Sequence, residues 1–387
     1  MEPKLRFKEF NGDWEEKRLG DIVTFLDGKR KPLEKGERIS GKYPYYGASG
    51  IIDYVKDYIF DEELILLSED GANIIDRNYR VCFLARGKYW VNNHAHVLKA
   101  KENNYNAFVC EALERLNYQK YNTGTAQPKL NQDVCKKIIL NTPSLPEQTK
   151  IADFLSTVDE KIQNQQDKIT HLENIKKGFM QKIFSRKIRF KDANGNEFPE
   201  WEEKKLEDTI ETIIDNRGKT PPISSSGYPL IEIASMQNNG LNYRKIEKYV
   251  SDETYKTWFR NHIKADDILF STVGAYSGSL SYYDGKIKSC IAQNIIGLRF
   301  AQNSKFMMYL LSEKENQKRI QNIKMNQAQP SIKVTQMIKL KFLIPCLKEQ
   351  QKIADFLSSF DEKIDVEKEI LDHLKELKKG LLQQMFV

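Results

Sequence analysis

The stretch KIADFLSTVDEKI occupies Lys150–Ile162, and it returns almost unchanged as KIADFLSSFDEKI at Lys352–Ile364, 202 residues later. The match extends without a gap over residues 147–184 and 349–386, with 20 identities in 38 positions. An ungapped match of this length indicates an internal duplication, and a duplication has to be recognised before the fold is interpreted. We therefore treat the chain as two related halves.

Both copies carry apolar residues at steps of four and three, which is the spacing of the seam of a coiled coil. The pattern predicts two long helices, each a rod of roughly 57 Å at about 1.5 Å per residue. The predicted seam residues are Ile151, Leu155, Val158, Ile162, Gln165, Ile169, Leu172, Ile353, Leu357, Phe360, Ile364, Glu367, Leu371 and Leu374.

A polar residue stands at the same seam position in both copies, Gln165 in the first and Glu367 in the second. Polar seam residues commonly fix the register of a coiled coil. This favours pairing of the two copies over the alternative that each is an amphipathic helix lying on its own domain core. Two similar halves related by a two-fold axis place the helices antiparallel. We therefore expect Gln165 to lie beside Glu367.

The duplication continues on both sides of this segment. LRFKEFNGDWEEKRL from Leu5 resembles IRFKDANGNEFPEWEEKKL from Ile188, and AQPKL at Ala126–Leu130 aligns with AQPSI at Ala328–Ile332. Between these motifs the halves share little beyond a Tyr-Pro pair. Apolar and β-rich runs alternate there with Gly-rich polar loops, which predicts mixed α/β domains.

The predicted fold class is thus α/β, with two mixed α/β domains separated by two long helices that form an antiparallel coiled coil with internal pseudo-two-fold symmetry. The expected boundaries are residues 1–146 for the first domain, 147–187 for the first helix, 188–348 for the second domain and 349–387 for the second helix. Predicted strands include Leu64–Ser68, His96–Ala100, Asp267–Val273 and Asn294–Phe300.

Composition permits nucleic acid as a partner. The chain has 387 residues and a net charge of +7, which is compatible with binding a polyanion but does not require it. No 18-residue apolar run is present, the N-terminus lacks the apolar core of a signal peptide, and the five cysteines have no CxxC spacing. These features predict reduced thiols and a cytoplasmic location, with no membrane partner.

Catalytic and metal-binding motifs are not evident in the sequence. RGKT at Arg217–Thr220 lacks the upstream glycine of a phosphate-binding loop, because Ile213 stands there. NHAH at Asn93–His96 offers two histidines that would share one face of a strand, but no third ligand is evident, so a structural or DNA-contacting role is favoured over a metal site. Two diverged domains on one repeated frame suit recognition better than catalysis.

The motifs resemble one family. Each half opens with W-E-x-K-x-L and closes with QP followed by P-x-L-x-E-Q-x-K-I-A-x-F-L-S-x-x-D-x-K-I. Over essentially its whole length the chain resembles the DNA specificity subunit of type I restriction–modification systems. The resemblance implies two target recognition domains, each reading one half of a split, asymmetric DNA site, with the helices as a ruler for the spacer.

The resemblance also implies partners. Two modification subunits would dock on the helices and use S-adenosylmethionine to methylate adenine, and restriction subunits would add ATP- and Mg-dependent translocation and cleavage. This chain itself would be non-catalytic and would hold no cofactor. The outward residues of the first copy, Lys150, Asp153, Asp159 and Glu160, are candidates for the docking surface.

Recognition domains of this family vary, so candidate DNA-binding residues are chosen by their chemistry: cations for phosphate, and amides, hydroxyls and arginines for base edges. In the first domain they are Lys29, Arg30, Lys31, Ser49, Arg77, Asn92, Asn93, His94, Thr125, Gln127 and Lys129. In the second they are Asn216, Arg217, Lys219, Thr220, Gln237, Asn238, Tyr276, Ser277, Gln329 and Ser331.

Two other functions remain open from the residues alone. A self-contained DNA methyltransferase or nuclease with fused recognition domains predicts S-adenosylmethionine binding by the isolated chain. A scaffold whose variable domains bind other proteins predicts no split footprint on DNA.

Overall fold

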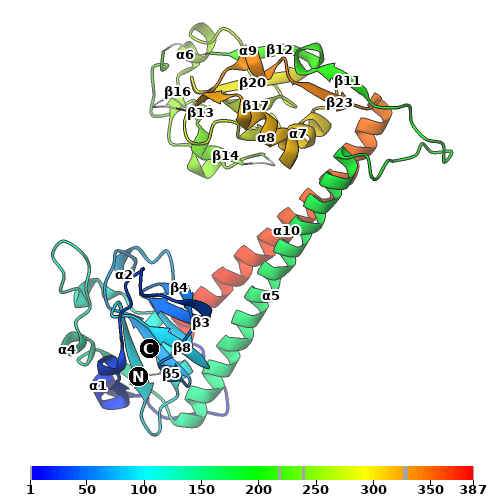
Figure 1. Ribbon diagram of the computed structural model, residues 1–387. Helices are drawn as coiled ribbons and strands as arrows, with labels where there is room; N and C mark the ends of the chain where they lie inside the picture. Colours follow the sequence, from blue (N-terminus) through cyan, green and yellow to red (C-terminus); the bar gives the residue numbers. More distant parts are fainter. Residues whose placement is uncertain (1, 217–218, 238–239, 326–329, 387) are drawn as a thin grey trace. The chain divides into compact units, whose positions relative to one another are not determined.

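The structure is a computed structural model that describes residues 2–216, 219–237, 240–325 and 330–386. The chain divides into two compact units (Figure 1). The first unit comprises Met1–Gln166 and Glu369–Val387, and the second comprises Asp167–Lys368. Each long helix therefore contributes one part to each unit, and the two units are described separately.

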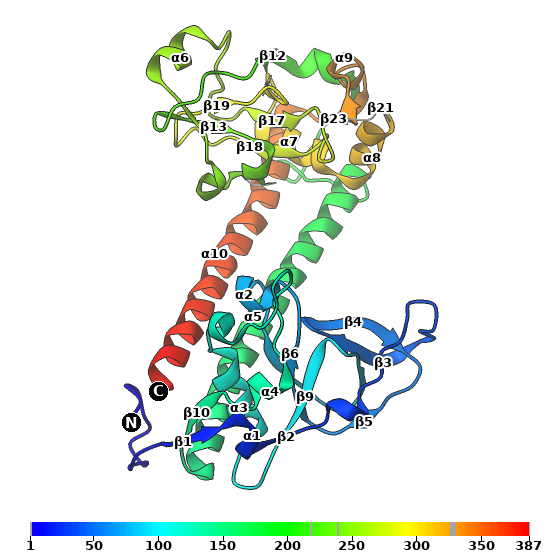
Figure 2. The same cartoon turned by 90° about the vertical axis from the view of Figure 1, so that its left-hand side faces the viewer.

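The first unit contains two four-stranded sheets and a strand pair, in the orders β2-β9-β6-β7, β4-β3-β8-β5 and β1-β10 (Figure 2). The strands are β1 (Glu15–Arg18), β2 (Val23–Phe25), β3 (Ser40–Gly47), β4 (Gly50–Val55), β5 (Phe60–Asp61), β6 (Leu64–Ser68), β7 (Cys82–Ala85), β8 (Lys88–Val91), β9 (Ala95–Ala100) and β10 (Ile139–Thr142). The helices are α1 (Leu19–Ile22), α2 (Asn73–Asp76), α3 (Asn106–Glu114) and α4 (Gln132–Cys135), with short 3-10 turns η1 (Asp27–Lys29) and η2 (Tyr118–Tyr121).

The second unit has the sheets β12-β20-β17-β18 and β16-β13-β19 and the pairs β11-β23, β14-β15 and β21-β22. The strands are β11 (Glu202–Lys205), β12 (Ile210–Asp215), β13 (Tyr228–Ile231), β14 (Met236–Gln237), β15 (Gly240–Leu241), β16 (Tyr249–Val250), β17 (Ile268–Ser271), β18 (Leu280–Tyr282), β19 (Cys290–Ile291), β20 (Ile295–Phe300), β21 (Lys324–Met325), β22 (Ser331–Ile332) and β23 (Lys341–Ile344). The helices are α6 (Asp252–Thr257), α7 (Ser304–Ser312), α8 (Lys314–Asn322) and α9 (Val334–Met337), with turns η3 (Leu206–Thr209), η4 (Ile233–Ser235) and η5 (Tyr243–Lys245).

The middle region of each half, between the opening motif and the AQP segment, has the same strand topology although the sequences differ. β3 pairs antiparallel with β4 and parallel with β8, and β13 pairs antiparallel with β16 and parallel with β19. The Tyr-Pro of each half lies on the equivalent strand, at Tyr43-Pro44 and Tyr228-Pro229. The two middle regions therefore share strand pairing although their sequences share little beyond the Tyr-Pro pair, in keeping with the mixed α/β fold predicted for both.

The two predicted long helices are confirmed as α5 (Leu145–Phe184) and α10 (Leu347–Met385). Their pairing is antiparallel in each unit. In the first unit Lys378 binds Asp159, and the start of α5 shares a hydrophobic core with Leu381 and Leu382. In the second unit Lys176 binds Asp361, and Phe179 packs on Phe356 with ring centroids 5.0 Å apart.

The predicted seam faces inward. Eight of the seam residues are buried, namely Ile151, Leu155, Val158, Ile169, Ile353, Leu357, Ile364 and Leu371, and the others are half-buried. The contact of Gln165 with Glu367 stays a prediction, because these residues belong to different units.

The repeated stretch also encodes reciprocal ion pairs. Asp159 of the first copy pairs with Lys378 of the second copy at 2.7 Å, and Asp361 of the second copy pairs with Lys176 of the first at 2.5 Å. The two aspartates are 202 residues apart, and so are the two lysines. Asp159, which was expected to face outward, pairs with the opposite helix and keeps 42% of its side chain exposed.

The Glu-Gln pair at the start of each long helix ties the opening motif to the helix. Glu147 is 2% exposed and accepts hydrogen bonds from Arg6 and from the Trp14 indole. Glu349 is 0% exposed and accepts the same bonds from Arg189 and Trp201. This shared network explains why the W-E motif and the distant E-Q pair occur together in both halves.

The glutamine that follows each glutamate has an equally constant role. Gln148 donates to the Pro143 carbonyl and accepts from the Tyr105 amide just before α3. Gln350 makes the same two bonds with Pro345 and Asn303, just before α7. Each long helix is therefore joined to the start of a shorter helix, α3 in the first unit and α7 in the second.

Candidate nucleic-acid interface

Three loops meet where the central strand β6 of the first unit ends. The Gly71 amide donates to the Pro128 carbonyl of the AQP segment at 3.0 Å, and the Leu130 amide donates to the Glu69 carbonyl at 2.7 Å. The Glu69 amide donates to the His94 carbonyl of the loop between β8 and β9 at 2.9 Å. Backbone bonds therefore hold the loop after β6, the loop before β9 and the AQP segment in one place.

The second unit repeats these bonds at the end of β17. The Gly274 amide donates to the Pro330 carbonyl at 2.8 Å, and the Ile332 amide donates to the Thr272 carbonyl at 2.9 Å. The Thr272 amide donates to the Asn294 carbonyl at 2.9 Å. The same three loops therefore come together in both units. Their contacts are made by backbone groups, which can form these bonds whatever side chains are present.

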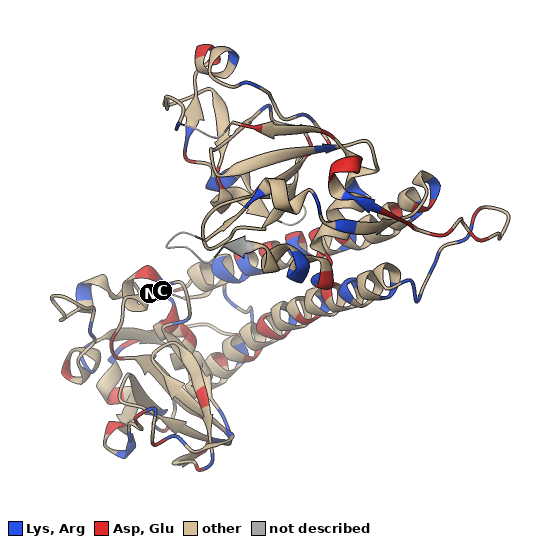
Figure 3. Cartoon of the chain, turned by 45° about the horizontal axis from the view of Figure 1, so that its top comes forward, with Lys and Arg blue, Asp and Glu red and all other residues tan. Residues whose placement is uncertain are grey.

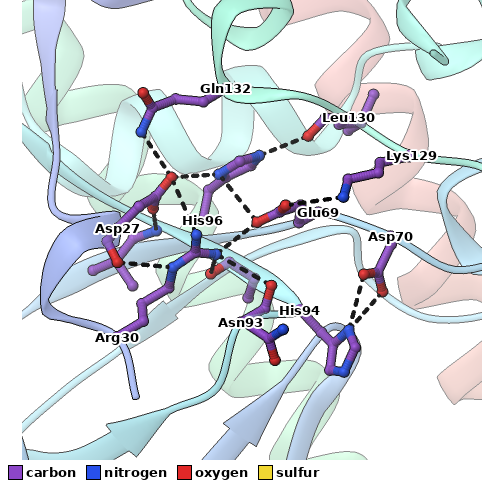
Figure 4. A network of polar contacts seen from close by, with 12 residues as sticks. Asp27, Arg30, Glu69, Asp70, Asn93, His94, His96, Lys129, Leu130 and Gln132 are labelled. Carbon is purple, nitrogen blue, oxygen red and sulfur yellow. Dashed lines mark hydrogen bonds and ion pairs between the residues drawn. The ribbon is translucent and has the colours of Figure 1, made fainter. Parts of the chain in front are cut away.

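In the first unit a charged network lies beneath the loops (Figure 4). His96 has a side-chain exposure of 2%, with Nδ1 2.7 Å from Asp27 and Nε2 2.7 Å from the Leu130 carbonyl. Arg30 bonds Glu69 at 2.7 Å and the Ala95 carbonyl at 2.7 Å. We call Asp27, Arg30, Glu69 and His96 the charged hub.

Both ring nitrogens of His96 face acceptors, so both must donate and the imidazole is cationic. Burial alone lowers the pKa of His96, but the hydrogen bond to Asp27 and neighbouring interactions raise it to about 10. Burial conversely raises the pKa of Asp27, but the bond from His96 outweighs this and the pKa is lowered. The hub is thus a buried ion-pair network that fixes the loops.

The equivalent layer of the second unit is different. Strand register aligns His96 with Ile296, because Leu98 pairs with Ile65 as Leu298 pairs with Ile268. Thr272 takes the place of Glu69. The frame is therefore kept, while Ile296 and Thr272 stand where the hub has His96 and Glu69.

Most first-unit candidates for DNA contact lie at exposed positions of these loops or beside them. The exposed candidates are Lys29, Lys31, Ser49, Arg77, Asn93, His94, Thr125, Gln127 and Lys129. Arg77 is also engaged by Glu114, through both its carboxylate and its backbone carbonyl. The remaining candidates face inward: Arg30 belongs to the charged hub, and the buried Asn92 accepts from the His94 amide at 2.8 Å. A direct DNA contact by Arg30 or Asn92 would need the loop to rearrange.

The second-unit candidates are more scattered. Lys219, Thr220, Gln237 and Tyr276 are exposed, and Tyr276, at 71% exposure, lines a groove of about 490 Å³. Ser277 is buried, Ser331 is half-buried, and Asn216 binds the backbone of Arg260 and Asn261. Arg217, Asn238 and Gln329 lie outside the described residues. All of these DNA contacts stay predictions.

Sequence reasoning missed Asp27, Glu69, Asp70 and His96 as residues that shape the site. The NHAH motif contained a signal, but the two histidines do not share a face. His94 is exposed and contacts Asp70, whereas His96 is buried against Asp27. Within the described part of the chain no group of three His, Cys, Asp or Glu residues is placed to hold a metal ion. None of the described helices is both long and apolar enough to cross a membrane.

The fold and the loops together define a class of protein: a duplicated chain in which paired helices join two α/β recognition units of shared frame and different loop chemistry. The family model described as "Type I restriction modification DNA specificity domain" matches residues 11–174 and 199–376. These matches cover most of the chain, and the chain belongs to this family.

Relatives agree over nearly full length. The type I restriction enzyme MjaVIII specificity subunit of Methanocaldococcus jannaschii is 24% identical, over 97% of this chain and 94% of the relative. A putative type I restriction enzyme specificity subunit of Haemophilus influenzae is 26% identical, over 89% of this chain and 87% of the relative. The crystal structure of a type I restriction–modification S subunit from M. genitalium has the same fold, with a TM-score of 0.62 at 17% identity over 100% of this chain and 99% of that chain.

Proposed function

We propose that this chain is the non-catalytic DNA-reading subunit of a type I restriction–modification complex, and that each unit reads one half of a split, asymmetric site. The observation that carries the proposal is the convergence of the same three loops in both units with different side chains on them. Two unlike reading surfaces specify two unlike half-sites. Since each mismatch costs roughly 1–3 kcal/mol, two half-sites combine to high specificity.

The paired helices act as the ruler for the spacer and as the dock for two modification subunits. α5 and α10 carry both signs of charge along their length (Figure 3). Their equivalent positions Asp153 and Asp355, and likewise Glu160 and Glu362, are exposed in both copies. A repeated outer surface suits two copies of one partner. Lys150, also predicted to face outward, is exposed and lies 3.4 Å from Glu9.

The partners supply the chemistry in this proposal. Modification subunits hold S-adenosylmethionine and methylate adenine, and restriction subunits use ATP and Mg for translocation and cleavage. This chain binds duplex DNA and its partner subunits, and holds no cofactor itself.

Co-expression with the modification subunit, followed by genome-wide mapping of methylated adenine, tests the proposal. The expected result is one motif with two specified blocks and an unspecified gap. Exchanging the region between Trp14 and Gln127 for that of a relative should change only one block. Stoichiometric S-adenosylmethionine binding by the purified chain alone, or methylation at an unsplit site, would contradict the proposal.

A further inference from the structure

The His94 imidazole is held at the exposed edge of the converging loops of the first unit. Its side chain is 51% exposed, and Nδ1 lies 2.9 Å from both carboxylate oxygens of Asp70 (Figure 4). Its backbone is fixed on both sides: the amide donates to Asn92 Oδ1, and the carbonyl accepts from the Glu69 amide. The ring therefore stands on a built loop, with Nδ1 engaged by Asp70 and about half of the side chain exposed.

The carboxylate decides what the other nitrogen can do. An ionised carboxylate only accepts hydrogen bonds, so Nδ1 carries the proton. In a neutral imidazole Nε2 then has a lone pair and is an acceptor. A carboxylate behind a histidine fixes both the tautomer and the ring orientation in the same way at other protein sites. In the neutral ring, Asp70 thus makes Nε2 of His94 an acceptor of defined direction.

An acceptor at this position selects its partner on DNA. Phosphate oxygens are themselves acceptors and cannot donate to Nε2, and the Asp70 charge disfavours a phosphate nearby. In the major groove the donors on base edges are the exocyclic amino groups of cytosine and adenine. The exposed Lys129, whose backbone forms a bridge with Asp70 and whose Nζ lies 3.6 Å from Glu69, carries the opposite charge and is suited to a neighbouring phosphate.

We propose that His94, oriented by Asp70, reads an exocyclic amino group of cytosine or adenine at one base pair of the half-site bound by the first unit. The inference rests on the proposed function and adds the chemistry of one recognised base. Asp70 is a positioning residue, because it acts through the His94 ring.

The second unit has no such pair. Asn294 stands in place of His94, since its carbonyl accepts the equivalent bond from Thr272. Val273 stands in place of Asp70, since it forms the equivalent bridge with the AQP segment, to Ser331. Valine offers no acceptor to orient a neighbour. The second unit therefore provides a control for the first within the same chain.

The test uses the complex assembled with its modification subunits and duplexes that carry the mapped site. Each adenine or cytosine of the two half-sites is replaced in turn by purine or 2-pyrimidinone, which lack the amino group, and affinity is measured by fluorescence anisotropy. For the wild-type chain, one replacement in the first half-site should weaken binding by about 5- to 150-fold. In the His94→Ala and Asp70→Ala variants, the same base replacement should weaken binding little further, because the hydrogen bond between His94 and the amino group is already lost.

Asn294→Ala is the matched control, and it should leave discrimination at the first half-site unchanged. His94→Asn serves as a second variant if His94→Ala does not assemble. Equal weakening of every duplex by His94→Ala, or undiminished discrimination at all amino groups, would overturn the inference. If the wild-type complex still binds the split site in either case, the proposed function is unaffected. If the wild-type complex does not bind a split site, the proposed function itself is contradicted.

Discussion

The two units build the same arrangement of three loops with different side chains. Each places three loops at the end of a central antiparallel strand, β6 or β17, through the same backbone bonds. Beneath the loops the first unit buries a cationic histidine with carboxylates, whereas the second has Ile296 and Thr272 at the equivalent positions. Backbone bonds and the long helices carry the frame, so the side chains on the loops and in the layer beneath them are free to diverge.

The constant parts lie away from the loops. The buried Glu147 and Glu349, each with an arginine and a tryptophan, are shared by both units. So are the reciprocal pairs of Asp159 with Lys378 and Asp361 with Lys176. Sequence identity between the halves therefore marks the residues that hold the frame together.

The largest expected effect comes from breaking the shared anchor. Glu147→Gln and Glu349→Gln should each destabilise by about 4 kcal/mol, because each removes the buried counter-charge of a partly buried arginine and leaves it only an exposed glutamate, Glu2 or Glu200. Urea unfolding measures the loss, and hydrogen exchange should place it in the first unit for Glu147→Gln and in the second unit for Glu349→Gln. Glu160→Gln and Glu362→Gln, at exposed positions of the same helices, are the controls. Markedly unequal losses for the two anchors would break the equivalence of the units.

The charged hub should make only the first unit sensitive to alkaline pH. His96→Gln removes a buried cation and should cost about 3 kcal/mol at pH 6.5. The folded pKa of His96 is raised to about 10 from an ordinary 6.5, so its contribution is fully present below pH 6.5 and is lost as pH rises toward 10. The gap in melting temperature between wild type and His96→Gln should therefore shrink between pH 6.5 and 9.5. A gap that stays constant would contradict the cationic histidine.

Sequence periodicity was sufficient for the long helices but not for the site. The seam from Ile151 to Leu374 follows from local spacing. The hub does not follow, because His96 lies 69 residues from Asp27 and no local pattern links them. The likeness of the middle regions was hidden because their equivalent contacts use backbone atoms, which leave no mark in the sequence.

The reciprocal ion pairs should be unequal in strength. Asp361 and Lys176 are 13% and 14% exposed, and Asp361 also accepts from the Tyr309 hydroxyl. Asp159 is 42% exposed and faces more water. Asp361→Asn should therefore cost about 2 kcal/mol, as for a shielded charged hydrogen bond, and Asp159→Asn less than about 1 kcal/mol. Urea unfolding of the two variants in parallel measures both values, and a reversed order would show that exposure does not set their strength.

The smallest expected effect concerns phosphate contacts, in which the two units should be alike. Lys31 and Lys219 are exposed and follow Asp27 and Asp215 at the same spacing, after the equivalent strands β2 and β12. If each neutralises one phosphate, Lys31→Gln and Lys219→Gln should each lower the slope of log affinity against log salt by about 1. Anisotropy titrations at several salt concentrations measure the slope. Base discrimination at both half-sites should persist, because a phosphate contact carries no sequence information. Suppose instead that one variant loses discrimination at a single base pair while its salt slope is unchanged. That lysine would then contact a base edge, and the two units would differ in their phosphate contacts as well as in the layer beneath the loops.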